Sequence, residues 1–142
     1  MIHIEGFLVN DDCNELGIKG RCYSLPEMIY FDIVNESHNF YENETNDEEN
    51  IDISMLIPKV SFRIFFSDIK CSLDDAMDNQ ILASIGELDI LQYWYGYSEY
   101  TVEALSIEKF QLISNDGGKH DLKQIFNNYI GKYVHILIEI LE

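Results

Sequence analysis

The sequence predicts an α+β fold: a mostly antiparallel sheet of about six strands, with two short helices lying on it as a single layer. Three observations lead to this prediction. A chain of 142 residues has the size of one domain and buries roughly two thirds of the surface that its unfolded state exposes. Apolar residues make up 46% of the chain, which is enough to fill one core. Several stretches alternate apolar and polar side chains with the period of a strand, whereas a helical period occurs in two short segments.

The first half of the chain is expected to contain three strands and one loop. Two strands rich in β-branched and aromatic residues are predicted at 2–9 ("IHIEGFLV") and 27–34 ("EMIYFDIV"). The stretch "NESHNFYENETNDEEN" has almost no aliphatic side chain, so it cannot bury enough apolar surface to offset the entropy lost on ordering. A mobile acidic loop is therefore expected at about 35–52. A third strand is predicted at 54–69, with Pro58 at its start or edge. One apolar face of this strand is expected to consist of Val60, Phe62, Ile64 and Phe66.

The middle of the chain is expected to form a helix followed by strands. Ser72 is a candidate N-cap for a helix that Gly86 would end. Residues 80–85 ("QILASI") fit a strand as well as a helix, so both alternatives stay open there. Further strands are predicted from their alternation at 88–96, 99–105 and 107–113.

The last quarter of the chain is expected to close the fold. After the turn "NDGG", a short helix is predicted at 120–131, with Asp121 near the positive end of its dipole and Gly131 as its C-cap. The final strand, at 132–141, is largely apolar on both faces toward its end. Such a strand belongs in the middle of a sheet, with a helix covering one side. The whole chain is expected to be a single domain.

Net charge is the strongest global property of the sequence. Asp and Glu number 26 against 9 Lys and Arg, so the formal charge is −17. Residues 35–57 hold seven acids and residues 71–108 hold eight, and neither stretch contains Lys or Arg. Such a charge repels nucleic acids and anionic membranes and attracts basic surfaces and cations. We therefore expect no direct nucleic-acid partner and no membrane partner, although solubility alone would also explain the charge.

Cysteines and apolar runs indicate the compartment. Three cysteines without a C-x-x-C pair predict neither a disulfide framework nor a zinc knuckle, and they fit free thiols in a reducing compartment. The N-terminal stretch lacks the basic region of a signal peptide, and no apolar run approaches the roughly 18 residues of a membrane span. The sequence predicts a cytoplasmic protein without a cofactor.

The motifs "YGYSEYTV", "GGKHDL" and "GKYVHILIE" follow one another in the second half of the chain. With this order, the chain resembles a family of small uncharacterised proteins from Firmicutes genomes, phages and mobile elements. The resemblance covers roughly Phe62 to Glu139. It implies an origin in a phage or mobile element, and it carries no activity and no catalytic residue.

Two late histidines are the main catalytic candidates. His120 and Asp121, together with His135 and Glu99, would make a general-base or metal cluster in a small enzyme or ligand-binding protein. The sequence has no H-x-x-x-H or H-E-x-x-H spacing, however, and "GYSEY" around Ser98 lacks the second glycine of a nucleophile elbow. We therefore predict no catalytic residue and no metal ligand, and we keep the cluster as the alternative.

The sequence best supports a non-enzymatic inhibitor or antidote that binds a basic protein surface, such as that of a nuclease. Side chains on one strand face recur every ~6.6 Å, which is comparable with twice the ~3.4 Å spacing of phosphates along a strand, so rows of acids can mimic a nucleic acid. Acids of the loop and first helix would steer association, and aromatic side chains would supply contact area. The predicted partner-binding residues are Glu36, Glu42, Glu44, Asp47, Glu48, Glu49, Asp74, Asp75, Asp78, Tyr93, Trp94, Tyr95 and Tyr97. A structural protein that oligomerises through a strand edge is the remaining alternative.

Overall fold

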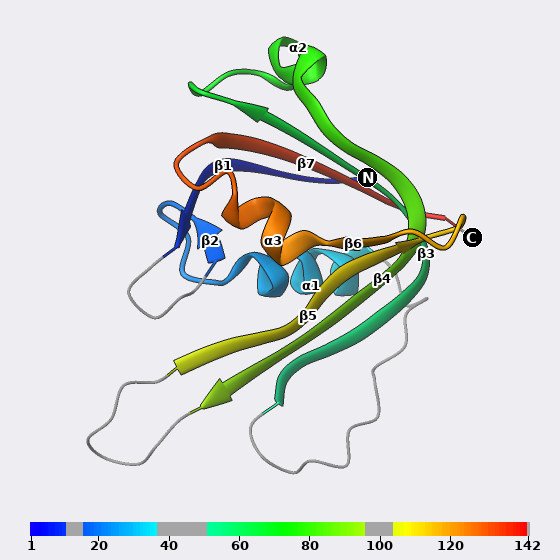
Figure 1. Cartoon of the computed structure of the whole chain (residues 1–142). Coiled ribbons are helices and arrows are strands. Elements are labelled where there is room, and N and C mark those ends of the chain that lie inside the picture. The colour runs from blue at the N-terminus through cyan, green and yellow to red at the C-terminus, as the bar shows by residue number, and fades with distance from the viewer. Residues whose placement is uncertain (11–15, 37–50, 96–103, 142) are drawn as a thin grey trace.

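The structure is a computed structural model, and it describes residues 1–10, 16–36, 51–95 and 104–141. In these ranges the chain forms seven strands, three α-helices and one 3₁₀ helix (Figure 1). The strands are β1 (Ile2–Asn10), β2 (Leu16–Ile18), β3 (Ile51–Ser67), β4 (Gln80–Tyr95), β5 (Ala104–Ser114), β6 (Lys119–Asp121) and β7 (Tyr133–Ile140). The helices are α1 (Leu25–Glu36), α2 (Leu73–Ala76), the 3₁₀ helix η1 (Met77–Asn79) and α3 (Leu122–Asn127).

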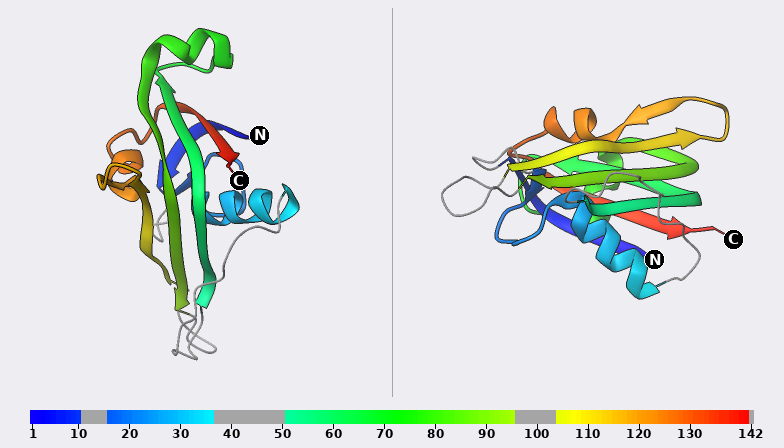
Figure 2. Two further views of the ribbon diagram at one scale, coloured as in Figure 1. Left: turned by 90° about the vertical axis from the view of Figure 1, so that its right-hand side faces the viewer. Right: turned by 90° about the horizontal axis from the view of Figure 1, so that it is seen from below.

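All seven strands belong to one antiparallel sheet, in the order β2-β1-β7-β3-β4-β5-β6. The sheet curls into a half-barrel around α1 and α3, as the views in Figures 1 and 2 show. Apolar side chains of both helices and of the concave sheet face share one hydrophobic cluster. The predicted α+β class and the mostly antiparallel sheet are therefore confirmed, with seven strands in place of about six.

Two features bend the long β3–β4 pair. Pairing of β3 with β4 shifts register between Ile57 and Val60, and the buried positions of β3 change there from odd to even numbers. Pro58, which cannot donate to a ladder, lies at this irregularity. On β4, Gly86 pairs with Val60 on one side and with Ser114 on the other. The predicted apolar face of β3 is confirmed, because its four residues are all buried in the main cluster.

Residues 27–34 form part of helix α1, so the prediction of a strand there is wrong. Ser24 and Glu27 make a capping box: the Ser24 hydroxyl accepts from the Glu27 backbone N–H, and the Glu27 carboxylate accepts from the Ser24 backbone N–H. Leu25, Ile29 and Ile33 then recur every four residues and are fully buried. The cap and this helical stripe outweigh the strand propensity of the aromatic and β-branched residues between them.

The helix predicted to run from Ser72 to Gly86 is much shorter. The Ser72 hydroxyl accepts from the Asp75 backbone N–H at 3.3 Å, which confirms the N-cap. Helical structure ends with η1, and residues 80–85 are strand, so the strand alternative is the correct one. Gly86 lies inside β4 and does not end a helix.

Helix α3 and strand β7 follow the sequence prediction with one difference. The Asp121 carboxylate caps α3 by accepting from the Gln124 backbone N–H at 3.3 Å. The helix ends at Asn127, and Gly131, with φ of 90°, belongs to the turn beyond it and not to a C-cap. Strand β7 is third in the sheet and buries six consecutive residues, as expected of an inner strand.

Helix α2 lies on the other side of the sheet from the main core. Its Ala76 packs with Phe65 and Leu137 in a small cluster of its own, so the helices do not form a single layer. The predicted loop at about 35–52 and the predicted strand at 99–105 fall mostly outside the described residues. None of the described helices is long and apolar enough to cross a membrane.

Candidate functional site

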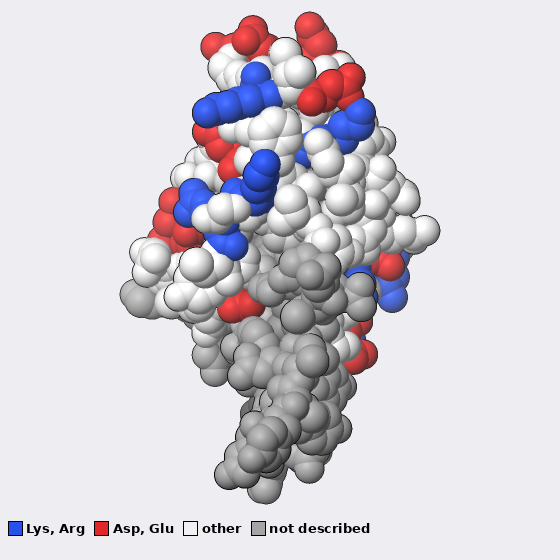
Figure 3. Space-filling model, turned by 90° about the vertical axis from the view of Figure 1, so that its left-hand side faces the viewer, with Lys and Arg blue, Asp and Glu red and all other residues white. Residues whose placement is uncertain are grey.

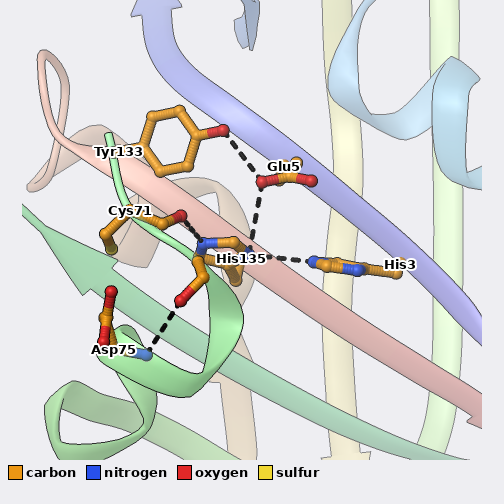
Figure 4. A network of polar contacts seen from close by, with 7 residues as sticks. His3, Glu5, Cys71, Asp75, Tyr133 and His135 are labelled. Atoms are coloured by element: carbon orange, nitrogen blue, oxygen red, sulfur yellow. Dashed lines mark hydrogen bonds and ion pairs between the residues drawn. The ribbon is translucent and has the colours of Figure 1, made fainter. Parts of the chain in front are cut away.

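The outer face of β1 and β7, opposite the main core, carries a cluster of polar side chains (Figure 4). Side chains alternate along β1, so His3 and Glu5 point outward while Ile2 and Ile4 are buried. Strand β7 places Tyr133 and His135 on the same outer face. Because the antiparallel register sets Glu5 directly opposite His135, four polar side chains meet across two neighbouring strands. We call this set of His3, Glu5, Tyr133 and His135 the histidine cluster.

The histidine cluster is connected by short contacts. His3 Nε2 lies 2.9 Å from His135 Nδ1, and Glu5 Oε2 lies 3.7 Å from the same nitrogen. The Tyr133 hydroxyl donates to Glu5 Oε2 at 2.9 Å. On the other side of its ring, His135 Nε2 lies 2.8 Å from the Cys71 carbonyl oxygen. His135 is 1% exposed, whereas His3 and Glu5 are open to solvent.

These partners define the hydrogen positions on the buried imidazole. A carbonyl oxygen can only accept, so His135 Nε2 carries a proton and donates to Cys71. In the neutral ring the lone pair then lies on Nδ1, which faces His3 and Glu5. Cys71, in the segment before α2, thus holds the His135 ring with its unprotonated Nδ1 directed at His3 and Glu5.

The Tyr133 phenol depends on its neighbours in the histidine cluster. Burial, and then its hydrogen bond to Glu5 and the Glu5 charge, raise the pKa of Tyr133 above its ordinary value of 10.0. The folded state therefore favours the neutral phenol. This contribution to stability is complete below pH 10 and is lost as the pH rises through the raised pKa.

Replacing Tyr133 with phenylalanine is expected to lower the free energy of unfolding by about 1 kcal/mol at neutral pH, because one hydrogen bond is lost. Above about pH 10 the difference from the parent protein should shrink and then disappear, since the variant has no phenol to ionise. Urea unfolding from about pH 7 to about pH 11 measures both effects. A difference that stays constant across this range would contradict the role given to the phenol.

The acidic residues predicted on the first helix lie at a protruding end of the molecule. The segment Asp68–Ile81, which we call the tip, joins β3 to β4 and contains α2 and η1 (Figure 2). Asp74, Asp75 and Asp78 are exposed on it. Three large apolar residues of the tip are also exposed: Ile69 at 70%, and Met77 and Ile81 at 44% each.

The other predicted partner-binding residues are not brought together with the tip. Strand β4 runs from Gln80 to Tyr95, so about 40 Å of strand path separates the end of the tip from Tyr93, Trp94 and Tyr95 at the far end. Tyr93 is half-buried, and the side chains of Trp94 and Tyr95 are outside the described residues. Glu36 ends α1, where its carboxylate lies 3.5 Å from the N-terminal amine. Five loop acids and one tyrosine of the predicted set lie outside the described ranges: Glu42, Glu44, Asp47, Glu48, Glu49 and Tyr97.

The enzyme alternative required His120, Asp121, Glu99 and His135 in one pocket. His120 is on edge strand β6, and β3, β4 and β5 lie between it and β7 in the sheet. Asp121 caps α3, and Glu99 is outside the described residues. The structure therefore does not assemble His120 and His135 into one site; His135 instead meets residues of β1.

No protein-family model, curated protein or solved structure matches this chain. The likeness to a phage and mobile-element family accordingly stays a prediction from three motifs. The histidine cluster and the surface of the tip are the candidate functional regions among the described residues.

Charge on the described surface is mixed in sign. All nine Lys and Arg lie in the described ranges, together with 15 of the 26 acids, so the remaining 11 acids belong to residues outside them. Figure 3 shows acidic and basic side chains side by side over the described part of one face, with acids at the upper end. Some acids are also paired: Asp68 with Lys132, and the buried Asp89 with Lys109 at 3.7 Å and with the Gln111 amide. On this face the acids do not form one continuous zone. The exposed acids of the tip are therefore better candidates for partner binding than the acids spread over the rest of the described surface.

Sequence reasoning missed His3 and Glu5. The signal was present as a pair of polar residues two apart on a predicted strand, "HIE", matched by "YVH" on the last strand. Neither pair indicates a site alone, because the register that joins them depends on residues about 130 positions apart in the sequence.

Proposed function

We propose that this chain is a non-enzymatic inhibitor or antidote, from a phage or mobile element, that binds a basic protein surface such as that of a nuclease. The tip is the part of the molecule that makes the first contact. Acids on it steer the partner, and exposed apolar side chains supply the buried area of the complex.

The observation that carries this proposal is the composition of the tip surface. Exposed Asp74, Asp75 and Asp78 adjoin exposed Met77 within a single turn of α2 and η1. Isolated apolar residues on a surface need no explanation, but apolar side chains with a polar rim are typical of protein-binding sites. Methionine suits such a site because its flexible thioether adapts to the shape of a partner.

Electrostatics favours a basic partner over other ligands. Between Asp68 and Ile81 the chain has four acids and one lysine, and Asp68 already pairs with Lys132. Interface charges of this kind act mainly on the association rate, by roughly 10- to 1,000-fold at low salt. The protruding position of the tip, clear of the half-barrel in Figure 2, leaves these charges accessible to a groove.

A triple substitution, Asp74→Asn with Asp75→Asn and Asp78→Asn, is expected to slow association by at least about tenfold at low salt. The partner is first recovered by pull-down from a host lysate at low and at high salt, and its association rate is then measured by surface plasmon resonance. Addition of the chain is expected to inhibit the enzymatic activity of that partner. Binding is expected to weaken as salt rises, since exposed charges are screened over about 8 to 10 Å.

The matched control changes net charge by the same three units away from the tip, with Glu87→Gln, Glu108→Gln and Glu139→Gln on strands β4, β5 and β7. Its association rate should stay within about twofold of the parent. The proposal fails if no basic partner is recovered, if recovery does not depend on salt, or if the control slows association as much as the tip variant does.

A further inference from the structure

We propose that the histidine cluster binds one divalent transition-metal ion, with His3 Nε2, Glu5 Oε2 and His135 Nδ1 as ligands and Zn²⁺ as the best-suited ion. The ligand atoms of these three residues all lie within 4.8 Å of one another. They come from neighbouring strands of an ordered sheet, and their spacing is not that of any metal-binding sequence motif. This site is independent of the proposed partner-binding function of the tip.

The distances are close to those of a tetrahedral site. With bonds of about 2.0 to 2.1 Å, two ligand atoms on a tetrahedral zinc ion are about 3.3 Å apart. The pair of nitrogens, now at 2.9 Å, would separate by a few tenths of an ångström, and Glu5 Oε2, at 3.7 Å from His135 Nδ1, would move in by a similar amount. His3 and Glu5 are exposed, so small rotations of these side chains suffice while the buried ring stays in place.

The Cys71 carbonyl orients His135 as a metal ligand requires. A ligating imidazole usually donates its second N–H to a carbonyl or carboxylate, which fixes the tautomer and strengthens the ligand. His135 makes this bond at 2.8 Å, which leaves the Nδ1 lone pair directed at the other two ligands. In Figure 4 the Cys71 carbonyl and the two exposed residues lie on opposite sides of the ring.

Glu5 has a supporting partner of the same kind. Its Oε2 accepts from the Tyr133 hydroxyl at 2.9 Å. Ligating carboxylates are commonly held by such hydrogen bonds. His135 is thus oriented by Cys71, and Glu5 is oriented by Tyr133. Neither Cys71 nor Tyr133 is itself a ligand of the proposed ion.

The donor set selects the class of metal. Two imidazoles and one carboxylate suit Zn²⁺, Co²⁺ and Ni²⁺, whereas Ca²⁺ and Mg²⁺ prefer sites made of oxygen atoms alone. Three protein ligands leave a fourth position for water, on the side where His3 and Glu5 face solvent. A bound ion would also link β1 to β7 and, through Cys71, to the segment that leads into α2.

The test is Zn²⁺ titration of the full chain, without a polyhistidine tag, by isothermal calorimetry at neutral pH in excess Ca²⁺. Calcium occupies sites made of carboxylates alone, so the remaining heat reports a nitrogen-containing site. One Zn²⁺ per chain is expected, and Co²⁺ should give the visible absorption of a four-coordinate complex. Tyr133→Phe, which keeps all three ligands, should weaken binding by about 10- to 100-fold, and His3→Gln and Glu5→Gln should weaken it further.

His120→Gln and Glu139→Gln are the matched controls, because they make the same changes at exposed or half-exposed positions outside the cluster and should leave the affinity unchanged. His3 and Glu5 are exposed, so their variants are expected to fold, and circular dichroism confirms this before titration. Absence of Zn²⁺ binding to the parent chain would overturn the proposal. Zn²⁺ binding that stays unchanged in Glu5→Gln and Tyr133→Phe would also overturn the proposal. That result would mean that His3 holds the ion together with nearby backbone amides, an arrangement that needs neither Glu5 nor Tyr133.

Discussion

Replacing Gly86 with alanine is expected to cost more than about 3 kcal/mol of unfolding free energy, or to prevent folding. A Cβ atom built at Gly86 would lie 2.1 Å from the Ile113 carbonyl oxygen and 2.7 Å from Ser114 Cα. These are backbone atoms of the neighbouring strand, so no side-chain rotation can relieve the clash. Adding a methyl group to a well-packed interior usually costs about 1 to 3 kcal/mol. Here the cost should exceed this range, because β5 itself must move away from β4.

Gly17→Ala is the matched control for this substitution. Gly17 is also a buried strand glycine, but the nearest atom to its added Cβ would be the Tyr23 carbonyl oxygen at 3.5 Å, which is an ordinary contact. Its variant should stay within about 1 kcal/mol of the parent. Urea unfolding gives both values from the shift of the midpoint at constant slope. Equal destabilisation by the two substitutions would show that close approach at Gly86 does not shape the sheet.

Elements with a clear local period were predictable from the sequence. The apolar alternation of β1, β3 and β7 is visible in each segment by itself, and the structure confirms those strands. The bends were not predictable. The sequence predicts Gly86 as the end of a helix because glycine interrupts helices, but glycine also occurs where two strands come unusually close. Only the position of β5 decides between these two meanings.

Helix α1 shows a different limit. Its eight central residues include aromatic and β-branched side chains that favour a strand, and the capping box before them was the decisive signal. The pattern S-x-x-E directly precedes the apolar run in the sequence. The strand prediction for residues 27–34 follows from the propensity of that segment alone, whereas the helix is specified by the residues just before it and by the buried stripe that tertiary packing selects.

Sites were less predictable than elements, because sites depend on register. The sequence predicts His135 as a candidate with His120 as its companion, since both lie near the end of the chain. The sheet instead pairs β7 with β1, which brings His3 and Glu5 to His135. In the same way, the sequence predicts one binding surface that contains both the acids of the tip and the tyrosines at the end of β4. These residues instead lie at opposite ends of one long strand.

Replacing Gln92 with leucine is expected to lower the free energy of unfolding by about 3 kcal/mol, although the two side chains are similar in volume. Gln92 is fully buried on β4, where its amide oxygen accepts from the Ser24 hydroxyl at 2.7 Å and its amide nitrogen donates to Glu27 Oε1 at 3.1 Å. Glu27 is 6% exposed. Leucine removes a donor from a buried carboxylate and an acceptor from a buried hydroxyl, and water cannot replace them without entering the core.

Gln111→Leu on the neighbouring strand is the matched control. Gln111 also donates to a carboxylate, Asp89 Oδ2 at 3.1 Å, but it is half-buried and Asp89 keeps Lys109 as an ion-pair partner at 3.7 Å. Its loss should cost about 1 kcal/mol. Urea unfolding of both variants measures the difference. If Gln92→Leu costs no more than Gln111→Leu, the capping box of α1 does not depend on β4. If Gln92→Leu costs the expected amount, Ser24 and Glu27, which begin α1, also anchor that helix inside the half-barrel through Gln92.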